Sequence, residues 1–113
     1  MLIVSFLFAP TEVEEFETIF PFFTSSQEQT KFINEADYNE EALILGTGGS
    51  ACVNISKYFS SSADNFIINS NSDKLNNKFL YFLLRYNTEI LEKGFKGVGL
   101  KHLSKEYLNS IKI

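Results

Sequence analysis

The change in hydrophobic period near residue 76 constrains the fold of this chain more than any other feature. The sequence NNKFLYFLLRYNTEILEK (76–93) has an apolar stripe at helical spacing. The residues of this stripe are Phe79, Phe82, Leu83, Tyr86 and Ile90. We expect an amphipathic helix over 76–93, capped by Ser72 or Asp73 and ended by Gly94 in the left-handed conformation. We expect the stripe to face the core rather than to stack on bases.

Strand-like segments precede this helix. The run ALIL (42–45) is continuously apolar, Val53 and Ile55 alternate with polar residues, and NFIIN (65–69) is a further short apolar run. IFPFFTSS (19–26) is aromatic but contains Pro21, which favours an edge strand or a bend. The patterns together predict an α+β fold with a small mixed or antiparallel sheet.

Both ends of the chain carry weaker signals. MLIVSFLFAP (1–10) lacks a basic segment and is too short to span a bilayer, so we expect a buried strand rather than a targeting or membrane segment. Thr11 and Glu14 have the spacing of a capping box for a short acidic helix. Near the C-terminus, Ser104 is expected to open a short helix and IKI (111–113) to form a strand.

Length and rare residues limit the possible architectures. The 113 residues fit one domain, 1–113. Cys52 is the single cysteine, which excludes an internal disulfide. His102 is the single histidine, so the two residues together are too few for a metal site of the Cys/His type. We therefore expect no metal and a reduced, cytoplasmic environment.

Charge is divided unevenly along the chain. Residues 1–70 hold two lysines and ten acids, whereas residues 71–113 hold eight basic residues and four acids. The two parts carry −8 and +4, which sum to the net charge of −4. An anionic partner is therefore expected to meet the C-terminal part of the chain.

The segment GTGGSA (46–51) admits three interpretations: a phosphate cradle, an active-site loop or a hairpin turn. A phosphate loop needs a lysine after its last glycine and a following helix, but Ser50 and Ala51 follow, and then a strand-like segment. The chain has no G-x-S-x-G nucleophile motif, no Asp/Asn-Pro-Pro-aromatic motif and no Glu-x-Lys. These absences favour a non-enzymatic chain without a cofactor. A plain hairpin with polar turn residues still accounts for the segment.

Several segments, in order and with preserved spacing, resemble the target recognition domain of type I restriction-modification specificity subunits. The resemblance covers residues 19–113, and residues 1–18 do not share it. The segments that carry it are PFFTSS (21–26), ALILGTGGSA (42–51), FSSSADNFII (59–68), NNKFLYFLL (76–84) and GFKGVGLKHLSKEYLNSIKI (94–113).

The resemblance implies a mixed α/β domain that reads one half of a split double-stranded DNA target. In that family, methyltransferase subunits supply the adenine-methylation chemistry and the specificity subunit has no catalytic residues. The expected partners are thus double-stranded DNA and a DNA adenine methyltransferase subunit, with a homodimer as a further arrangement. The alternative is a protein-interaction or decoy module, which an exposed apolar patch near Met1–Phe8 would favour.

The expected DNA-binding residues form three groups, in which lysines hold phosphates and Asn54 or His102 address base edges. The group around the glycine segment is Thr47, Ser50, Asn54, Lys57, Ser60 and Ser61. The late-loop group is Lys96, Lys101 and His102, and the third group is Ser25, Ser26 and Lys31. We expect the glycine segment and the late loop to contribute to one surface.

Overall fold

The structure is a computed structural model that describes residues 2–3, 19–26, 28–70, 75–97 and 102–111. It confirms the α+β class with small antiparallel and mixed sheets. The strands of the described residues are β1 (Leu2–Ile3), β2 (Phe20–Phe23), β3 (Lys31–Ile33), β4 (Ala42–Gly46), β5 (Val53–Ser56), β6 (Ser60–Ser61), β7 (Asn65–Ser70), β8 (Phe95–Lys96) and β9 (His102–Leu103). The helices are α1 (Asn77–Tyr86), α2 (Glu89–Glu92) and α3 (Lys105–Ser110).

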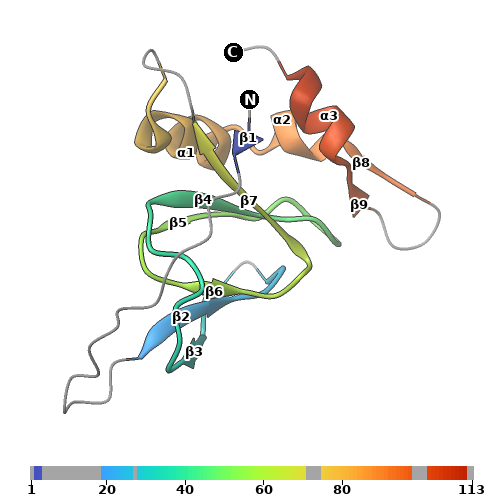
Figure 1. Ribbon diagram of the computed structural model, residues 1–113. Helices are drawn as coiled ribbons and strands as arrows, with labels where there is room; N and C mark the ends of the chain where they lie inside the picture. Colours follow the sequence, from blue (N-terminus) through green and yellow to red (C-terminus); the bar gives the residue numbers. More distant parts are fainter. Residues whose placement is uncertain (1, 4–18, 27, 71–74, 98–101, 112–113) are drawn as a thin grey trace.

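These elements form three layers (Figure 1). The central sheet has the strand order β1-β7-β4-β5, with every neighbouring pair antiparallel. The second sheet has the order β3-β2-β6, in which β2 is antiparallel to β3 and parallel to β6. The helices cover the face of the central sheet that is turned away from the second sheet, and the β8–β9 hairpin extends from the helical layer (Figure 1).

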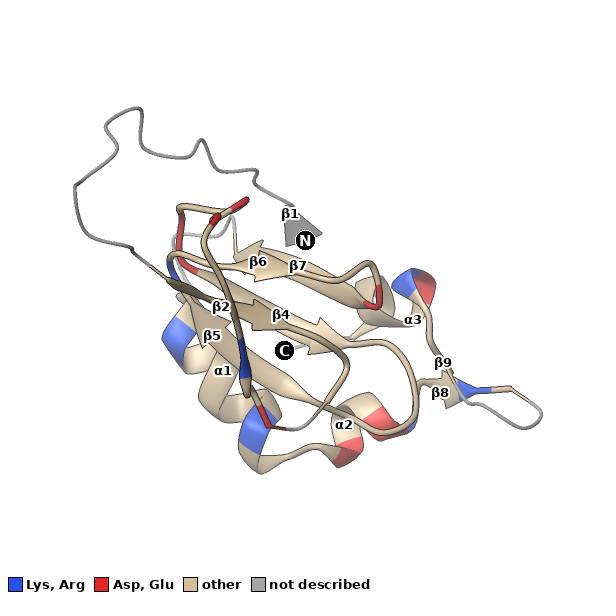
Figure 2. Ribbon diagram, turned by 90° about the horizontal axis from the view of Figure 1, so that it is seen from below, with Lys and Arg blue, Asp and Glu red and all other residues tan. Residues whose placement is uncertain are grey.

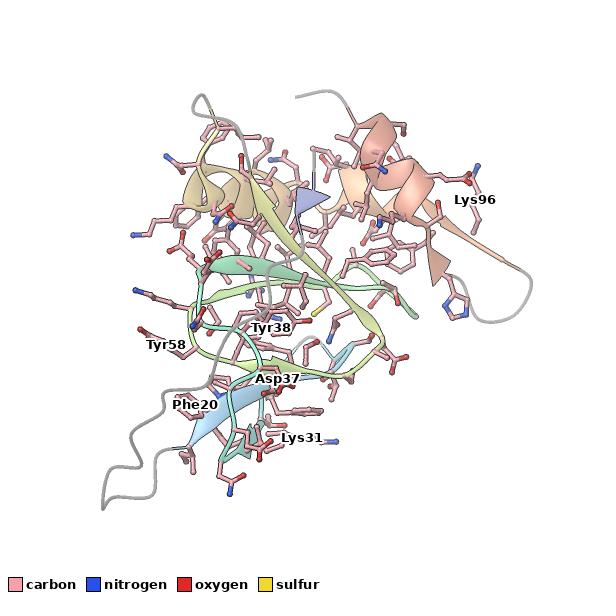
Figure 3. The ribbon with its side chains drawn as sticks, in the orientation of Figure 1. Phe20, Lys31, Asp37, Tyr38, Tyr58 and Lys96 are labelled. Atoms are coloured by element: carbon pink, nitrogen blue, oxygen red, sulfur yellow. The ribbon has the colours of Figure 1, made fainter. Side chains whose placement is uncertain are left out.

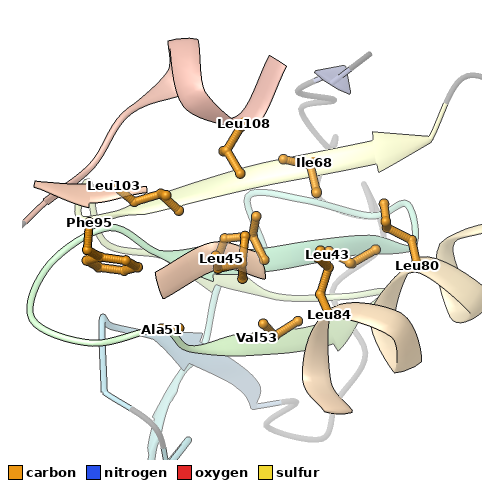
Figure 4. Packing of buried hydrophobic residues seen from close by; sticks show 11 residues of the cluster. Leu43, Leu45, Ala51, Val53, Ile68, Leu80, Leu84, Phe95, Leu103 and Leu108 are labelled. Atoms are coloured by element: carbon orange, nitrogen blue, oxygen red, sulfur yellow. The ribbon is translucent and has the colours of Figure 1, made fainter. Parts of the chain in front are cut away.

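Strand β4 is buried on both faces because it lies between the other two layers. Leu43 and Leu45 are fully buried in a cluster with the helices and the β8–β9 hairpin (Figure 4). Ala42 and Ile44 point the other way, toward the second sheet. There they form a cluster with Phe23 of β2, Ile67 of β7 and Phe59. A strand covered on both faces reads as a continuous apolar run, which is why ALIL lacks alternation.

The helix expected over 76–93 is divided into α1 and α2. Asn87 ends α1 with φ −136°, and its Nδ2 atom donates to the Leu83 carbonyl at 2.9 Å. The cap also differs from the prediction of Ser72 or Asp73, because the side chain of Asn76 accepts from the Phe79 amide at 2.7 Å. Asparagine is among the best N-cap residues, and Asn76 directly precedes the first turn of α1. The helix therefore begins after Asn76 rather than after Ser72 or Asp73.

The buried face of α1 is not the aromatic one that we predicted. Phe79 is 55% exposed, Phe82 54% and Tyr86 76%, whereas Leu80 and Leu84 are 6% and 3% exposed. Leu83 and Ile90 are half-buried. Because the helix is apolar around much of its circumference, a shift of one residue gives a second apolar stripe, and the branched leucines fill the core.

Gly94 is required for a reason other than the one predicted. It is not among the glycines with positive φ, which in the described residues are Gly49 (82°) and Gly97 (146°). A Cβ atom on Gly94 would instead come within 2.5 Å of the Cγ and Cε2 atoms of Tyr107. The glycine therefore allows α3 to pack closely on the end of the helical layer.

Three further expectations can be compared with the structure. The strand with Pro21 is not an edge strand, since β2 lies between β3 and β6; the β6 pairing covers only Phe22 and Phe23 and leaves the proline outside it. Ser104 caps α3 as expected, by accepting from the Tyr107 amide at 3.1 Å. Ile111 is an extended C-cap residue rather than part of a strand, and 112–113 lie outside the described residues.

At the N-terminus, β1 confirms a strand for Leu2–Ile3 through pairing with β7. The remainder of that run and the expected capping-box helix lie outside the described residues.

Candidate nucleic-acid interface

The glycine segment forms the hairpin turn between β4 and β5, and it contacts the late hairpin β8–β9. Gly48 and His102 form an antiparallel bridge, and the Leu103 amide donates to the Thr47 carbonyl at 2.8 Å. A Cβ atom on Gly48 would lie 3.9 Å from the Nδ1 atom of His102. Two polar segments that are far apart in the sequence are therefore neighbours at one end of the central sheet, as predicted.

The backbone carbonyl of Asp64 connects this turn to the loop that follows β2. It accepts from the Thr47 hydroxyl at 2.8 Å, from the Thr47 amide at 2.9 Å and from the Ser25 hydroxyl at 2.7 Å. The Sγ atom of Cys52 donates to the Ser26 carbonyl at 2.9 Å. These bonds hold the loop after β2, the turn before β7 and the glycine turn against each other.

We call the resulting set of side chains the polar rim. Its hairpin members Lys96 and His102 are direct cross-strand neighbours, and both are exposed. The rim consists of Ser25, Ser26, Thr47, Ser50, Lys96 and His102. The Lys96 ammonium, the His102 imidazole and the Ser26 hydroxyl can donate to phosphates or base edges. The hydroxyl protons of Ser25 and Thr47 are instead donated to the Asp64 carbonyl.

Other expected residues do not belong to the polar rim. Lys57 follows the far end of β5, where its Nζ atom lies 5.4 Å from the Tyr58 ring centroid. Lys31 lies on β3, and Figure 3 shows it well separated from Lys96. Asn54 is half-buried on β5, and its amide is 3.6 Å from the Cys52 sulfur.

The serines of β6 serve the interior. Ser60 is 1% exposed, and its hydroxyl donates to the Glu35 carbonyl at 2.7 Å and accepts from the Asp37 amide at 3.0 Å. Ser61 donates to the Ser62 carbonyl and accepts from Asn65 Nδ2. The expected DNA contact does not fit Ser60, because its hydroxyl is buried and already hydrogen-bonded on both sides. Lys101 lies outside the described residues.

Charges of both signs lie near the polar rim. Figure 2 shows a basic segment at the β8–β9 hairpin, where Lys96 lies, and an acidic one at the turn before β7. Asp64 is the exposed acid of that turn, and Lys105 opens α3 directly after the hairpin. The rim is thus not dominated by carboxylates.

Cys52 is a packing residue beneath the polar rim. It is 4% exposed, and burial raises the pKa of its thiol, although Arg85 and the hydrogen bond from Asn54 act in the opposite direction. A raised pKa disfavours the reactive thiolate at neutral pH. Across the described ranges, no group of three or more His, Cys, Asp or Glu side chains could hold a metal ion.

The backbone carbonyl of Asp64, which holds Ser25 and Thr47 of the polar rim in place, was not indicated by the sequence. A carbonyl carries no side-chain signature, so only the position of Asp64 in FSSSADNFII, before a predicted strand, could have drawn attention to it.

Comparison with known proteins gives one match. Residues 8–113 match the family described as the type I restriction modification DNA specificity domain. This match begins before Ile19 and so takes in part of the segment that we expected to be unmatched. No curated protein and no solved structure matches the chain. Among the described helices, none is both long and apolar enough to cross a membrane.

Proposed function

The chain belongs to the family of type I restriction modification DNA specificity domains, and on this premise we propose that it binds double-stranded DNA sequence-specifically through the polar rim. The supporting observation is the bridge between Gly48 and His102, which joins the glycine turn to the late hairpin in one surface. The rim would enter a groove while Lys96 holds a phosphate.

The chemistry of the rim suits this role. The exposed His102 imidazole can bond to a base edge, where one good contact gives about 1–3 kcal/mol of discrimination. Gly49 has φ 82°, and a Cβ atom there would meet nothing within 4 Å, so the turn leaves room for a close approach of the DNA backbone. Ser50 and Ser26 add exposed hydroxyl-bearing residues.

The domain would act without catalysing a reaction. Domains of this family are generally non-catalytic and generally associate with methyltransferase subunits. We extend both properties to this chain: it selects the DNA, and a DNA adenine methyltransferase subunit carries out the methylation.

The experiment is a selection from a random duplex library, followed by binding to the enriched sequence across a salt series. We expect an enriched motif and an affinity that falls steeply with salt. Lys96→Glu should weaken binding and lower the salt slope by about one unit or more. Lys57→Glu is the matched control, because it removes an exposed lysine at the other end of the central sheet.

Two results would refute the proposal. The first is the absence of any enriched sequence, which the protein-interaction alternative predicts. The second is equal binding by the Lys96 and Lys57 variants, which would remove the β8–β9 hairpin from the DNA-binding surface. Thermal unfolding of each variant shows whether a loss of binding reflects a loss of fold.

A further inference from the structure

Within the described residues, the outward face of α1 carries three exposed aromatic side chains, Phe79, Phe82 and Tyr86, which we call the aromatic stripe. They are 55%, 54% and 76% exposed, respectively. Their spacing of i, i+3 and i+7 is the one by which helix faces dock on partners. Large exposed aromatic residues in a contiguous row are a signal of an interaction site rather than of chance exposure.

Two rings of the stripe, those of Phe82 and Tyr86, are in contact with neighbouring rings. Phe82 stacks on Tyr86 with a centroid distance of 6.1 Å and an interplanar angle of 13°. On its other side, the half-buried Tyr81 ring lies 5.3 Å away at 62°. Since the Phe82 and Tyr86 rings already support each other, docking on these two rings would cost little further side-chain entropy.

The charged side chains of α1 itself are positive. Lys78 and Arg85 are exposed on the same helix, and α1, which reads NKFLYFLLRY, contains no acid. The nearest acid that follows in the sequence is Glu89, which opens the separate helix α2. The stripe is therefore an apolar row with cations along one side, which complements an apolar row with carboxylates along one side.

The area of the stripe limits what it can bind. With roughly 200 Å² for a whole aromatic side chain, the three exposed fractions leave about 370 Å² accessible. This is the size of a functional patch on a monomer, of about 300–600 Å². It is less than half of the ~800 Å² that each partner of a stable complex buries. Two copies paired through it would also bring cations against cations.

We infer that the aromatic stripe docks an acidic amphipathic helix of another protein. The apolar residues of that helix pack on the three rings, and its flanking carboxylates meet Lys78 and Arg85. Duplex DNA fits less well, because its bases are stacked inside the helix and its phosphates offer the rings no apolar partner. Helix α1, which carries the stripe, lies at the end of the helical layer away from β8 and β9 (Figure 1), so a helix docked on it leaves the polar rim open.

The test uses the full chain and two synthetic peptides locked as helices. One peptide has a leucine row flanked by glutamates, and the other carries lysines in place of the glutamates. Binding is measured by fluorescence anisotropy and located by amide chemical shifts. We expect the acidic peptide to bind with shifts along α1 and the basic peptide to bind at least about tenfold more weakly.

Variants then separate the stripe from exposed aromatic surface in general. Phe82→Ala should weaken binding of the acidic peptide at least about tenfold. Lys78→Glu should abolish the preference between the peptides, because the new carboxylate offsets the remaining charge of Arg85. Arg85 is left intact because its Nη1 atom donates to the Val53 carbonyl at 3.1 Å. Phe32→Ala, at a phenylalanine of β3 that is 57% exposed, is the control and should bind like the wild type.

The inference is overturned if the acidic peptide fails to bind, or if both peptides bind equally. It is also overturned if Phe32→Ala weakens binding as much as Phe82→Ala. A dimer in sedimentation that Phe82→Ala dissolves would assign the stripe to a second copy. A loss of duplex DNA affinity in that variant would assign it to DNA.

Discussion

The substitution Gly94→Ala offers a direct test of the packing between α3 and the helical layer. A Cβ atom at residue 94 would come within 2.5 Å of three ring atoms of Tyr107, closer than real Cβ atoms approach their neighbours. The Tyr107 ring has little freedom to move away, because its hydroxyl donates to the Ile90 carbonyl and the ring packs against the main core cluster. Either the ring or α3 must therefore shift.

The cost follows from three contributions. Overpacking costs about 1–3 kcal/mol, and loss of the Tyr107 hydrogen bond costs about 1 kcal/mol. Because Gly94 does not have a positive φ, the alanine also stabilises by about 0.4–1 kcal/mol through the unfolded state. The net loss is about 1–3 kcal/mol. With an unfolding entropy of roughly 2.1 cal/mol/K per residue, the melting temperature should fall by about 4–13 °C.

The assay is urea and thermal unfolding followed by circular dichroism. Gly48→Ala is the matched control, since its Cβ atom would meet nothing nearer than His102 at 3.9 Å. We expect the free energy of unfolding of this control to change by less than about 0.5 kcal/mol. A double-mutant cycle with Tyr107→Ala isolates the contact, because the alanine at 94 should cost little once the ring is absent. Equal stability of both glycine variants, or additive effects in the cycle, would refute the reasoning.

Two further predictions concern burial. Leu84→Ala, at a residue 3% exposed, should lower the free energy of unfolding by about 2–5 kcal/mol. Phe82→Ala, at a residue 54% exposed, should lower it by about 1 kcal/mol or less, and the reverse order in urea unfolding would contradict the observed face of α1. Ser60→Ala should cost about 1–3 kcal/mol, because it leaves the Glu35 carbonyl and the Asp37 amide without their shared hydroxyl. Its folded form should keep full DNA affinity, so a loss of affinity at unchanged stability would contradict the interior role of Ser60.

The sequence predicted those elements whose pattern is local and long enough to read. Strands β4, β5 and β7 have continuous or alternating apolar residues over four to six positions, and each was found. Strands β3, β6, β8 and β9 have two or three residues, which is too few for a period to show. They exist because of tertiary pairing, which for β6 joins distant residues such as Phe22 and Ser60 and for β8 and β9 joins near neighbours such as Phe95 and Leu103.

The face of α1 and the role of Gly94 depend on tertiary contacts. Periodicity gave the existence of the helix, but stripes through Phe82 and through Leu84 fit it equally well, and only the sheet beneath decides between them. For Gly94, the reason is an aromatic ring contributed by α3.

The candidate interface was partly foreseeable. The glycine turn and the late loop were expected on one surface, and the bridge from Gly48 to His102 joins them. Lys57 and Ser60 were grouped with the turn because they are near it in sequence. A strand of four residues carries Lys57 to the far end of the sheet, however, and pairing with β2 places Ser60 inside.

The polar rim is fastened partly through backbone amide and carbonyl groups, as between Leu103 and Thr47 or Thr47 and Asp64. Every residue has these backbone groups, except that proline lacks the amide donor. These hydrogen bonds therefore do not depend on which side chains the residues carry. Exposed positions such as Ser50 and His102 can then be exchanged during evolution while the scaffold persists. Under the proposed function, substitutions at these positions would change the DNA sequence that is bound while the fold is kept.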